Sequence, residues 1–72
     1  MEIEGTVLKV KKRYTRIRLN DNAKMDLMYR KSDNYIVNHL KKGDWMKAIV
    51  KVKSYTIGKR KLMAFHLHIV KD

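Results

Sequence analysis

The chain has 72 residues, and its 18 lysines and arginines exceed its seven aspartates and glutamates to give a formal net charge of +11. A chain of this length forms one small domain, residues 1–72, which buries only about 60% of its unfolded surface. Its 44% hydrophobic content is too high for a disordered chain. The absence of cysteine excludes disulfides, thiolate metal sites and a cysteine nucleophile.

The charge and the N-terminal sequence suggest the protein's environment and partner. No apolar run approaches the roughly 18 residues of a membrane span. The chain opens with Glu2 and Glu4 rather than with a basic signal segment, so we expect a cytoplasmic protein. The large excess of positive charge favours a polyanionic partner.

Alternating apolar and polar residues predict five strands. The first strand changes phase beside Gly5, which indicates a bend or a bulge. Asn20-Asp21-Asn22 is typical of a hairpin turn, because Asn and Asp tolerate left-handed backbone geometry. The expected strands cover residues 2–11, 14–19, 25–29, 45–55 and 63–69, with a last turn around Gly58 over residues 56–60.

One helix of about two turns is expected between Asp33 and Lys42. Ser32 suits its N-cap, and Gly43 suits a left-handed C-terminal cap. Two aromatic side chains, Tyr29 and Tyr35, are expected to pack between this helix and the strands.

The phase of the last two strands separates a core face from an outer face. In the fifth strand we expect Met63, Phe65, Leu67 and Ile69 to face the core. Trp45 either covers one end of the core, which its size favours, or joins a binding surface.

Two basic segments that contain tyrosine are the most informative feature of the sequence. They cover residues 11–18 and 51–61, and neither contains an acidic residue. Cations neutralise phosphates and aromatic rings stack on unpaired bases, so this combination is typical of a single-strand binder. The expected nucleic-acid-binding residues are Lys11, Lys12, Arg13, Tyr14, Arg16, Arg18, Lys47, Lys51, Lys53, Tyr55, Lys59, Arg60 and Lys61.

The order of elements predicts a mainly β protein, a five-stranded OB-fold barrel with one short helix between the third and fourth strands. Residues 48–72 resemble the last two strands of the small-subunit OB domains of the replication protein A type, on a basic hairpin turn followed by an alternating strand over residues 62–70. The chain is also similar to the compact single-strand-binding proteins of phages and plasmids. This resemblance implies that a ligand crosses strands two and three, between the two basic turns, with Arg16 and Arg18 on the floor.

The expected function is therefore non-enzymatic binding of single-stranded DNA with little sequence preference. Three alternatives stay open: an RNA-binding OB domain of the translation or ribosomal type, a basic SH3-like barrel on duplex DNA, and a protein-interaction module of a replication complex. The helix between strands three and four argues against the SH3-like barrel.

No catalytic residues and no cofactor are expected, because the acidic residues are scattered and no phosphate-binding loop is present. No metal site is expected either, since His66 and His68 lack further ligands nearby in the sequence. A small core and exposed strand edges favour self-association, so a homodimer is a further expectation.

Overall fold

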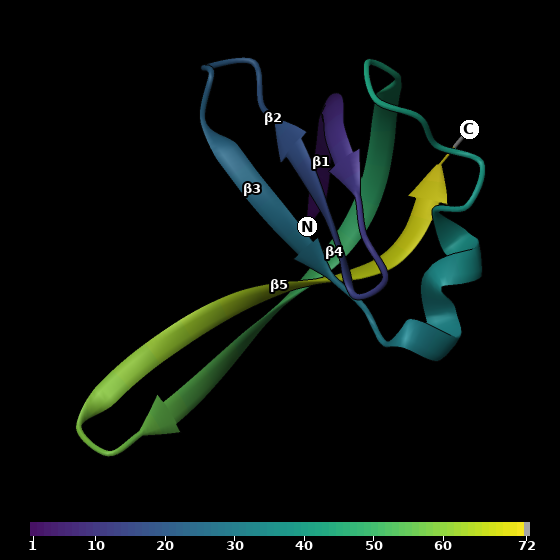
Figure 1. The fold of residues 1–72 in the computed structure, drawn as a ribbon. Coiled ribbons are helices and arrows are strands. Elements are labelled where there is room, and N and C mark those ends of the chain that lie inside the picture. The colour runs from purple at the N-terminus through teal and green to yellow at the C-terminus, as the bar shows by residue number, and fades with distance from the viewer. Residues whose placement is uncertain (72) are drawn as a thin grey trace.

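The computed structural model describes residues 1–71, which fold into a closed barrel of five strands with a long hairpin arm (Figure 1). The strands follow one another around the barrel in the order β1-β2-β3-β5-β4. The expected OB-like architecture is confirmed, with one short helix between the third and fourth strands. The elements are β1 (Glu2–Val10), β2 (Tyr14–Arg18), β3 (Lys24–Met28), the 3₁₀ helix η1 (Lys31–Ile36), β4 (Trp45–Ile57) and β5 (Arg60–Lys71).

β1 serves both halves of the barrel, because its first part pairs with β4 and its second part with β2. The register with β2 shifts between Val7 and Lys9, so the predicted irregularity is a β-bulge at this point. The barrel closes on a short parallel contact between β3 and β5, in which Leu27 pairs with Phe65 and Met28 with His66.

The core fills the barrel from all five strands and from the segment after η1. The inward phase expected for β2 and β3 is confirmed, since Thr15, Ile17 and Leu27 are fully buried. The buried hydrophobic residues are Val7, Ile17, Leu27, Tyr29, Val37, Met46, Ala48, Val50 and Leu67.

The helix differs from the sequence prediction in type, length and position. η1 covers six residues and ends at Ile36, and its N-cap position is Arg30, without a side-chain capping bond, so Ser32 is not the cap. Aromatic and β-branched residues at 35–37 have low α-helix propensity, which accounts for the early end. No helix within residues 1–71 has the length and apolar character needed to cross a membrane.

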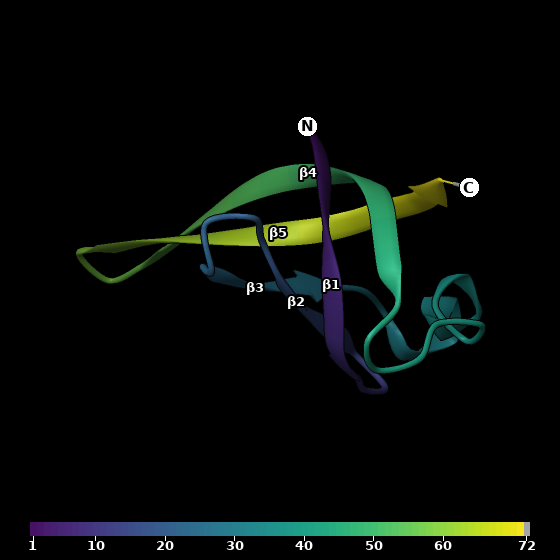
Figure 2. The same cartoon turned by 90° about the horizontal axis from the view of Figure 1, so that it is seen from above.

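β4 and β5 continue past the barrel as a two-stranded arm, which projects to the lower left in Figure 1 and to the left in Figure 2. Every residue from 51 to 63 is exposed. Ile57 pairs with Arg60, so the turn contains only two residues instead of the five expected. Gly58 has φ 61° at the first turn position, which suits the primed turns of two-residue hairpins.

The expected core face of β5 is wrong at both of its ends. Pairing with β4 moves from Ile49–Ile69 to Val50–Leu67, so β5 has an extra residue at His68 and its phase changes there. As a result Ile69 is 43% exposed, while its neighbour Val70 packs against the core. Met63 is 65% exposed, because it lies on the arm beyond the barrel.

Tyr35 is more exposed than the sequence predicts, and Trp45 takes the exposed one of its two expected positions. Tyr35 on η1 is 67% exposed and does not pack between the helix and the barrel. Trp45 at the start of β4 is 54% exposed, so it does not cover the end of the core. Tyr29, in contrast, is buried as expected.

The close crossing of β1 and β2 leaves no room for a side chain at Gly5. A Cβ atom there would lie 2.4 Å from the carbonyl oxygen of Arg18.

We predict that Gly5→Ala lowers the free energy of unfolding by about 1–3 kcal/mol, because the two strands must separate. Urea denaturation measures this loss. In the same assay Ser32→Ala should change stability by less than about 0.5 kcal/mol, because Ser32 makes no cap. Equal effects of the two substitutions would contradict this account.

Candidate nucleic-acid interface

Four strands place one residue each in a single row across the outer face of the sheet. Tyr14 of β2 pairs with Met28 of β3, Met28 pairs with His66 of β5, and His66 pairs with Lys51 of β4. Directly paired residues point to the same side of a sheet, so the four side chains share the outer face. We call these residues the cross-strand row.

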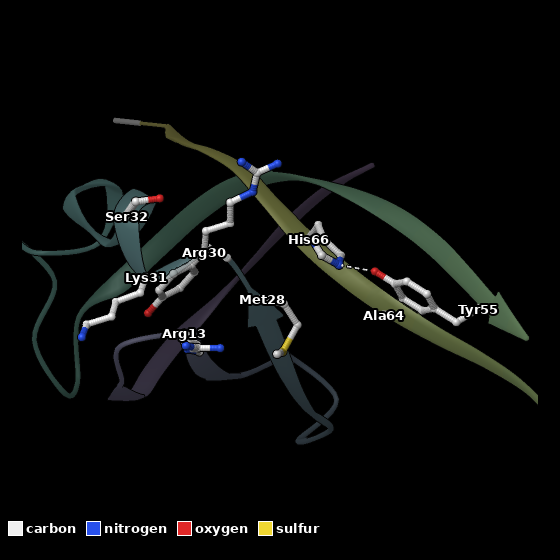
Figure 3. A pocket seen from close by; sticks show the side chains of 9 residues that line it. Arg13, Met28, Arg30, Lys31, Ser32, Tyr55, Ala64 and His66 are labelled. Carbon is white, nitrogen blue, oxygen red and sulfur yellow. Dashed lines mark hydrogen bonds between the residues drawn. The ribbon is translucent and has the colours of Figure 1, made fainter. Parts of the chain in front are cut away.

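Two adjoining hollows lie along this row, between the arm on one side and the β1–β2 turn and η1 on the other. The first has a volume of about 580 Å³, and Figure 3 shows side chains that reach it from the turn, from β3, from η1 and from the arm. The second has a volume of about 340 Å³ and shares Met28, Tyr29, Arg30 and His66 with the first. We call the two together the groove. It is lined by Arg13, Met28, Tyr29, Arg30, Lys31, Ser32, Asp33, Lys51, Lys53, Tyr55, Ala64, His66, Leu67 and His68.

The charges in the groove are strongly unbalanced. Its lining contains one carboxylate, that of Asp33. Within residues 1–71 none of the lining cations takes part in a salt bridge. An anion that enters the groove therefore meets positive charge that the protein's own acids do not neutralise. The five cations are Arg13, Arg30, Lys31, Lys51 and Lys53.

Tyr55 on the arm and His66 on β5 form a fixed pair at one end of the groove (Figure 3). The Tyr55 hydroxyl oxygen lies 2.9 Å from His66 Nε2, and the two ring centroids are 6.4 Å apart. Burial, together with the nearby charge of Lys53, lowers the pKa of His66 below its usual 6.5. The imidazole is therefore neutral at neutral pH, and Tyr55 stays 43% exposed.

Tyr29 connects the groove to the core. Its hydroxyl donates to the backbone carbonyl of Lys11 and accepts from the Thr15 hydroxyl at 3.0 Å, and its backbone N–H donates to the carbonyl of Arg13 at 3.0 Å. These bonds hold the β1–β2 turn against the end of β3, which places Arg13 at the groove. Burial raises the pKa of Tyr29, so its hydroxyl stays protonated and can donate.

The structure brings together part of the site expected from the sequence. Arg13 from the first basic segment and Lys51, Lys53 and Tyr55 from the second all line the groove. Tyr14 joins them through its pairing with Met28. The two segments therefore do meet along one hollow, as the sequence suggested.

The floor of the groove consists of Met28 and His66 rather than of Arg16 and Arg18. Arg16 lies two pairs further along β2 and is held by Asp26, with Nε–Oδ1 and Nη2–Oδ2 distances of 2.7 and 3.2 Å. The hydrogen bond from the Arg16 guanidinium keeps the pKa of the Asp26 carboxyl below its usual value. The Arg16 guanidinium also lies 5.7 Å from the centre of the Tyr14 ring, so its charge is partly engaged.

The other expected residues lie outside the groove. Lys11 and Lys12 line a separate hollow beside Asn34 and Asn38. Lys47 lies on another wall of the barrel, 3.7 Å from Glu4. The residues at the tip of the arm are Lys59, Arg60 and Lys61.

Sequence reasoning missed Arg30 and Lys31, which lie between the expected third strand and the expected helix, at the start of η1 in the structure. The signal for Met28 in the sequence is that it is an apolar residue out of phase with the core positions of its strand. His66 was considered as a metal ligand, but no three His, Cys, Asp or Glu residues within 1–71 are arranged to hold a metal ion.

Comparison of the chain with known protein families, with curated proteins and with solved structures finds no significant match. The function is therefore inferred from the geometry and charge of the groove.

The Tyr29 hydroxyl gives a test of how the groove is held. Tyr29→Phe removes the bonds to Thr15 and Lys11 and should lower the free energy of unfolding by about 1 kcal/mol. Tyr35→Phe is the matched control, because that side chain is 67% exposed. Thermal and urea denaturation measure both effects. A loss of the same size in the two variants would show that the hydroxyl has no structural role.

Proposed function

We propose that the protein binds single-stranded DNA in the groove, without a catalytic step and with little sequence preference. The observation that carries the proposal is the groove itself, which combines five cations without a salt-bridge partner among residues 1–71, one acid and an exposed tyrosine. An OB-like barrel supports it further, because barrels of this kind bind oligonucleotides across strands two and three, between the β1–β2 and β4–β5 connections.

The cations account for attraction without sequence specificity. Arg13, Arg30 and Lys31 lie on one side of the groove, and Lys51 and Lys53 lie on the other. A phosphodiester backbone that follows the groove meets positive charge along both sides. Contacts of this kind release counterions from any sequence equally.

The aromatic side chains account for the preference for a single strand. The Tyr55 and Tyr14 rings are available for stacking only on bases whose faces are open, and a duplex hides those faces. The larger hollow, at about 580 Å³, has the size of a small-ligand pocket and suits parts of one strand better than a duplex. Met28 on the floor and Ala64 in the lining offer an apolar surface against which a base can rest.

The first test is a salt titration of oligonucleotide binding. If each of the five groove cations neutralises one phosphate, log affinity should fall with log salt at a slope near −3.5, from about 0.7 per phosphate. Fluorescence anisotropy with matched single-stranded DNA, duplex DNA and RNA measures affinity and preference together. Tighter duplex binding would overturn the single-strand proposal, and tighter RNA binding would transfer the site to RNA. Failure to bind any of them at low salt would favour an acidic protein partner.

Substitution of Tyr55 tests the stacking contribution in the same assay. Tyr55→Ala should weaken binding by about 1–3 kcal/mol. Tyr55→Phe should retain most of the affinity, because it keeps the ring and loses only the hydrogen bond to His66. The matched control is Tyr35→Ala, an exposed tyrosine outside the groove lining. If all three variants bind equally well, Tyr55 does not stack on a base.

His66 should make binding depend on pH. Its pKa in the free protein lies below 6.5, so the ring is neutral at neutral pH. A phosphate nearby favours the charged ring and raises this pKa, so binding takes up a proton. Affinity should therefore rise as the pH falls through the pKa of His66 in the complex, and it should level off below the pKa of His66 in the free protein.

His66→Gln should reduce this rise, whereas His39→Gln, at an exposed histidine outside the groove, should retain it in full. Anisotropy across that pH range, with circular dichroism to confirm folding, measures the effect. A pH dependence that persists unchanged in His66→Gln would exclude His66 as its source.

A further inference from the structure

The barrel has a second outer face that shares no residue with the groove. It is formed where the start of β4 pairs with the start of β1 and with the end of β5. The intervening residues Ala48 and Met46 are buried, so their neighbours along β4 point outward. We call this face the far wall. It consists of Glu2, Glu4, Thr6, Trp45, Lys47, Ile49, Ile69 and Lys71.

The far wall exposes large apolar side chains. Trp45 is 54% exposed and Ile69 is 43% exposed, while Ile49, which pairs with Ile69, is half-buried. Trp45 also borders a hollow of about 310 Å³ with a mixed lining, in which Leu40, Met46 and Val70 lie beside His39, Asp44 and Lys71. An exposed tryptophan is typical of the residues that dominate protein–protein interfaces.

The charges of the far wall are balanced, unlike those of the groove. Glu4 lies 3.7 Å from Lys47, and Glu2 lies 3.3 Å from Lys71. The two acids lie on β1 and the two bases on β4 and β5, so the wall has no net charge, on a chain whose net charge is +11.

We propose that a second copy of this chain docks on the far wall, far wall against far wall, around a two-fold axis. A two-fold interface must be complementary to itself, and a patch that contains both signs of charge can place each Glu of one copy near a Lys of the other. Two copies that approached with their basic grooves facing each other would repel. A contact between two far walls adds no such repulsion, because the charges of each wall are balanced. A nucleic acid or an acidic protein would instead be drawn to the unpaired cations of the groove.

A dimer of standard size would cover a modest part of the protein surface. A standard interface takes about 800 Å² from each partner, which is about one seventh of the 5480 Å² surface of this protein. Burial of Trp45 and Ile69 would also supplement a core of only nine buried hydrophobic residues within residues 1–71.

Sedimentation equilibrium without nucleic acid tests the dimer, so its outcome does not depend on the proposed DNA binding. The wild type should show a species of twice the 8.6 kDa protomer mass at concentrations up to about 1 mM. Trp45→Ala and Ile69→Lys should each weaken the dimer about 30-fold or more. Tyr35→Ala and Met63→Lys, at exposed positions outside the far wall, should leave it unchanged. A monomeric wild type, or a dimer lost only in Met63→Lys, would overturn the proposal.

A charge exchange tests the pairing of the two walls directly. One variant carries Glu2→Lys with Glu4→Lys, and the other carries Lys47→Glu with Lys71→Glu. Each variant alone should be monomeric, because its walls carry like charges, and an equimolar mixture should form a heterodimer. Circular dichroism confirms that both variants fold. Folded variants that form homodimers as readily as the wild type would contradict a two-fold contact at this face.

Discussion

The short parallel contact between β3 and β5 is the constraint on which the rest of the structure depends. Only two residue pairs form it, Leu27–Phe65 on the inside and Met28–His66 on the outside. The inner pair continues the core across the closure of the barrel. The outer pair brings β2 and β3 beside the arm, so residues from the first and last thirds of the chain line one groove. A barrel open at this point would retain its hairpins and lose its candidate site.

Local sequence patterns predicted much of the fold, because strand alternation and turn chemistry depend on neighbouring residues. The inward phase of Ile17 and Leu27 and the irregularity near Val7 followed from such patterns alone. The errors have non-local causes. The bulge at His68 arises from pairing with β4, and the arm leaves the barrel because no third strand covers residues 51–63. The early end of η1 reflects weak propensity that no capping bond compensates.

The candidate site, like the fold, was predictable where it depends on local sequence and not where it depends on strand pairing. The two basic segments identified Arg13 and Tyr55, since composition alone marks a turn that carries cations and an aromatic ring. The floor could not be found in this way, because His66 reaches Met28 only through a parallel pairing between residues far apart in sequence. Arg16 shows the opposite error: its charge is evident in the sequence, but its engagement by Asp26 becomes visible only when β2 and β3 are paired.

The distribution of acids explains how one small protein can attract a polyanion and still tolerate a second copy of itself. Asp26 engages Arg16, while Glu2 and Glu4 engage the lysines of the far wall, so within residues 1–71 the cations that line the groove stay unpaired. In the proposed dimer each copy would keep its own groove, since the far wall and the groove share no residue. A strand long enough to reach both grooves would then bind through two sites, and its affinity would rise with length beyond what one groove supplies. The separation of the balanced far wall from the basic groove would therefore let a small domain form a dimer and keep both of its grooves open.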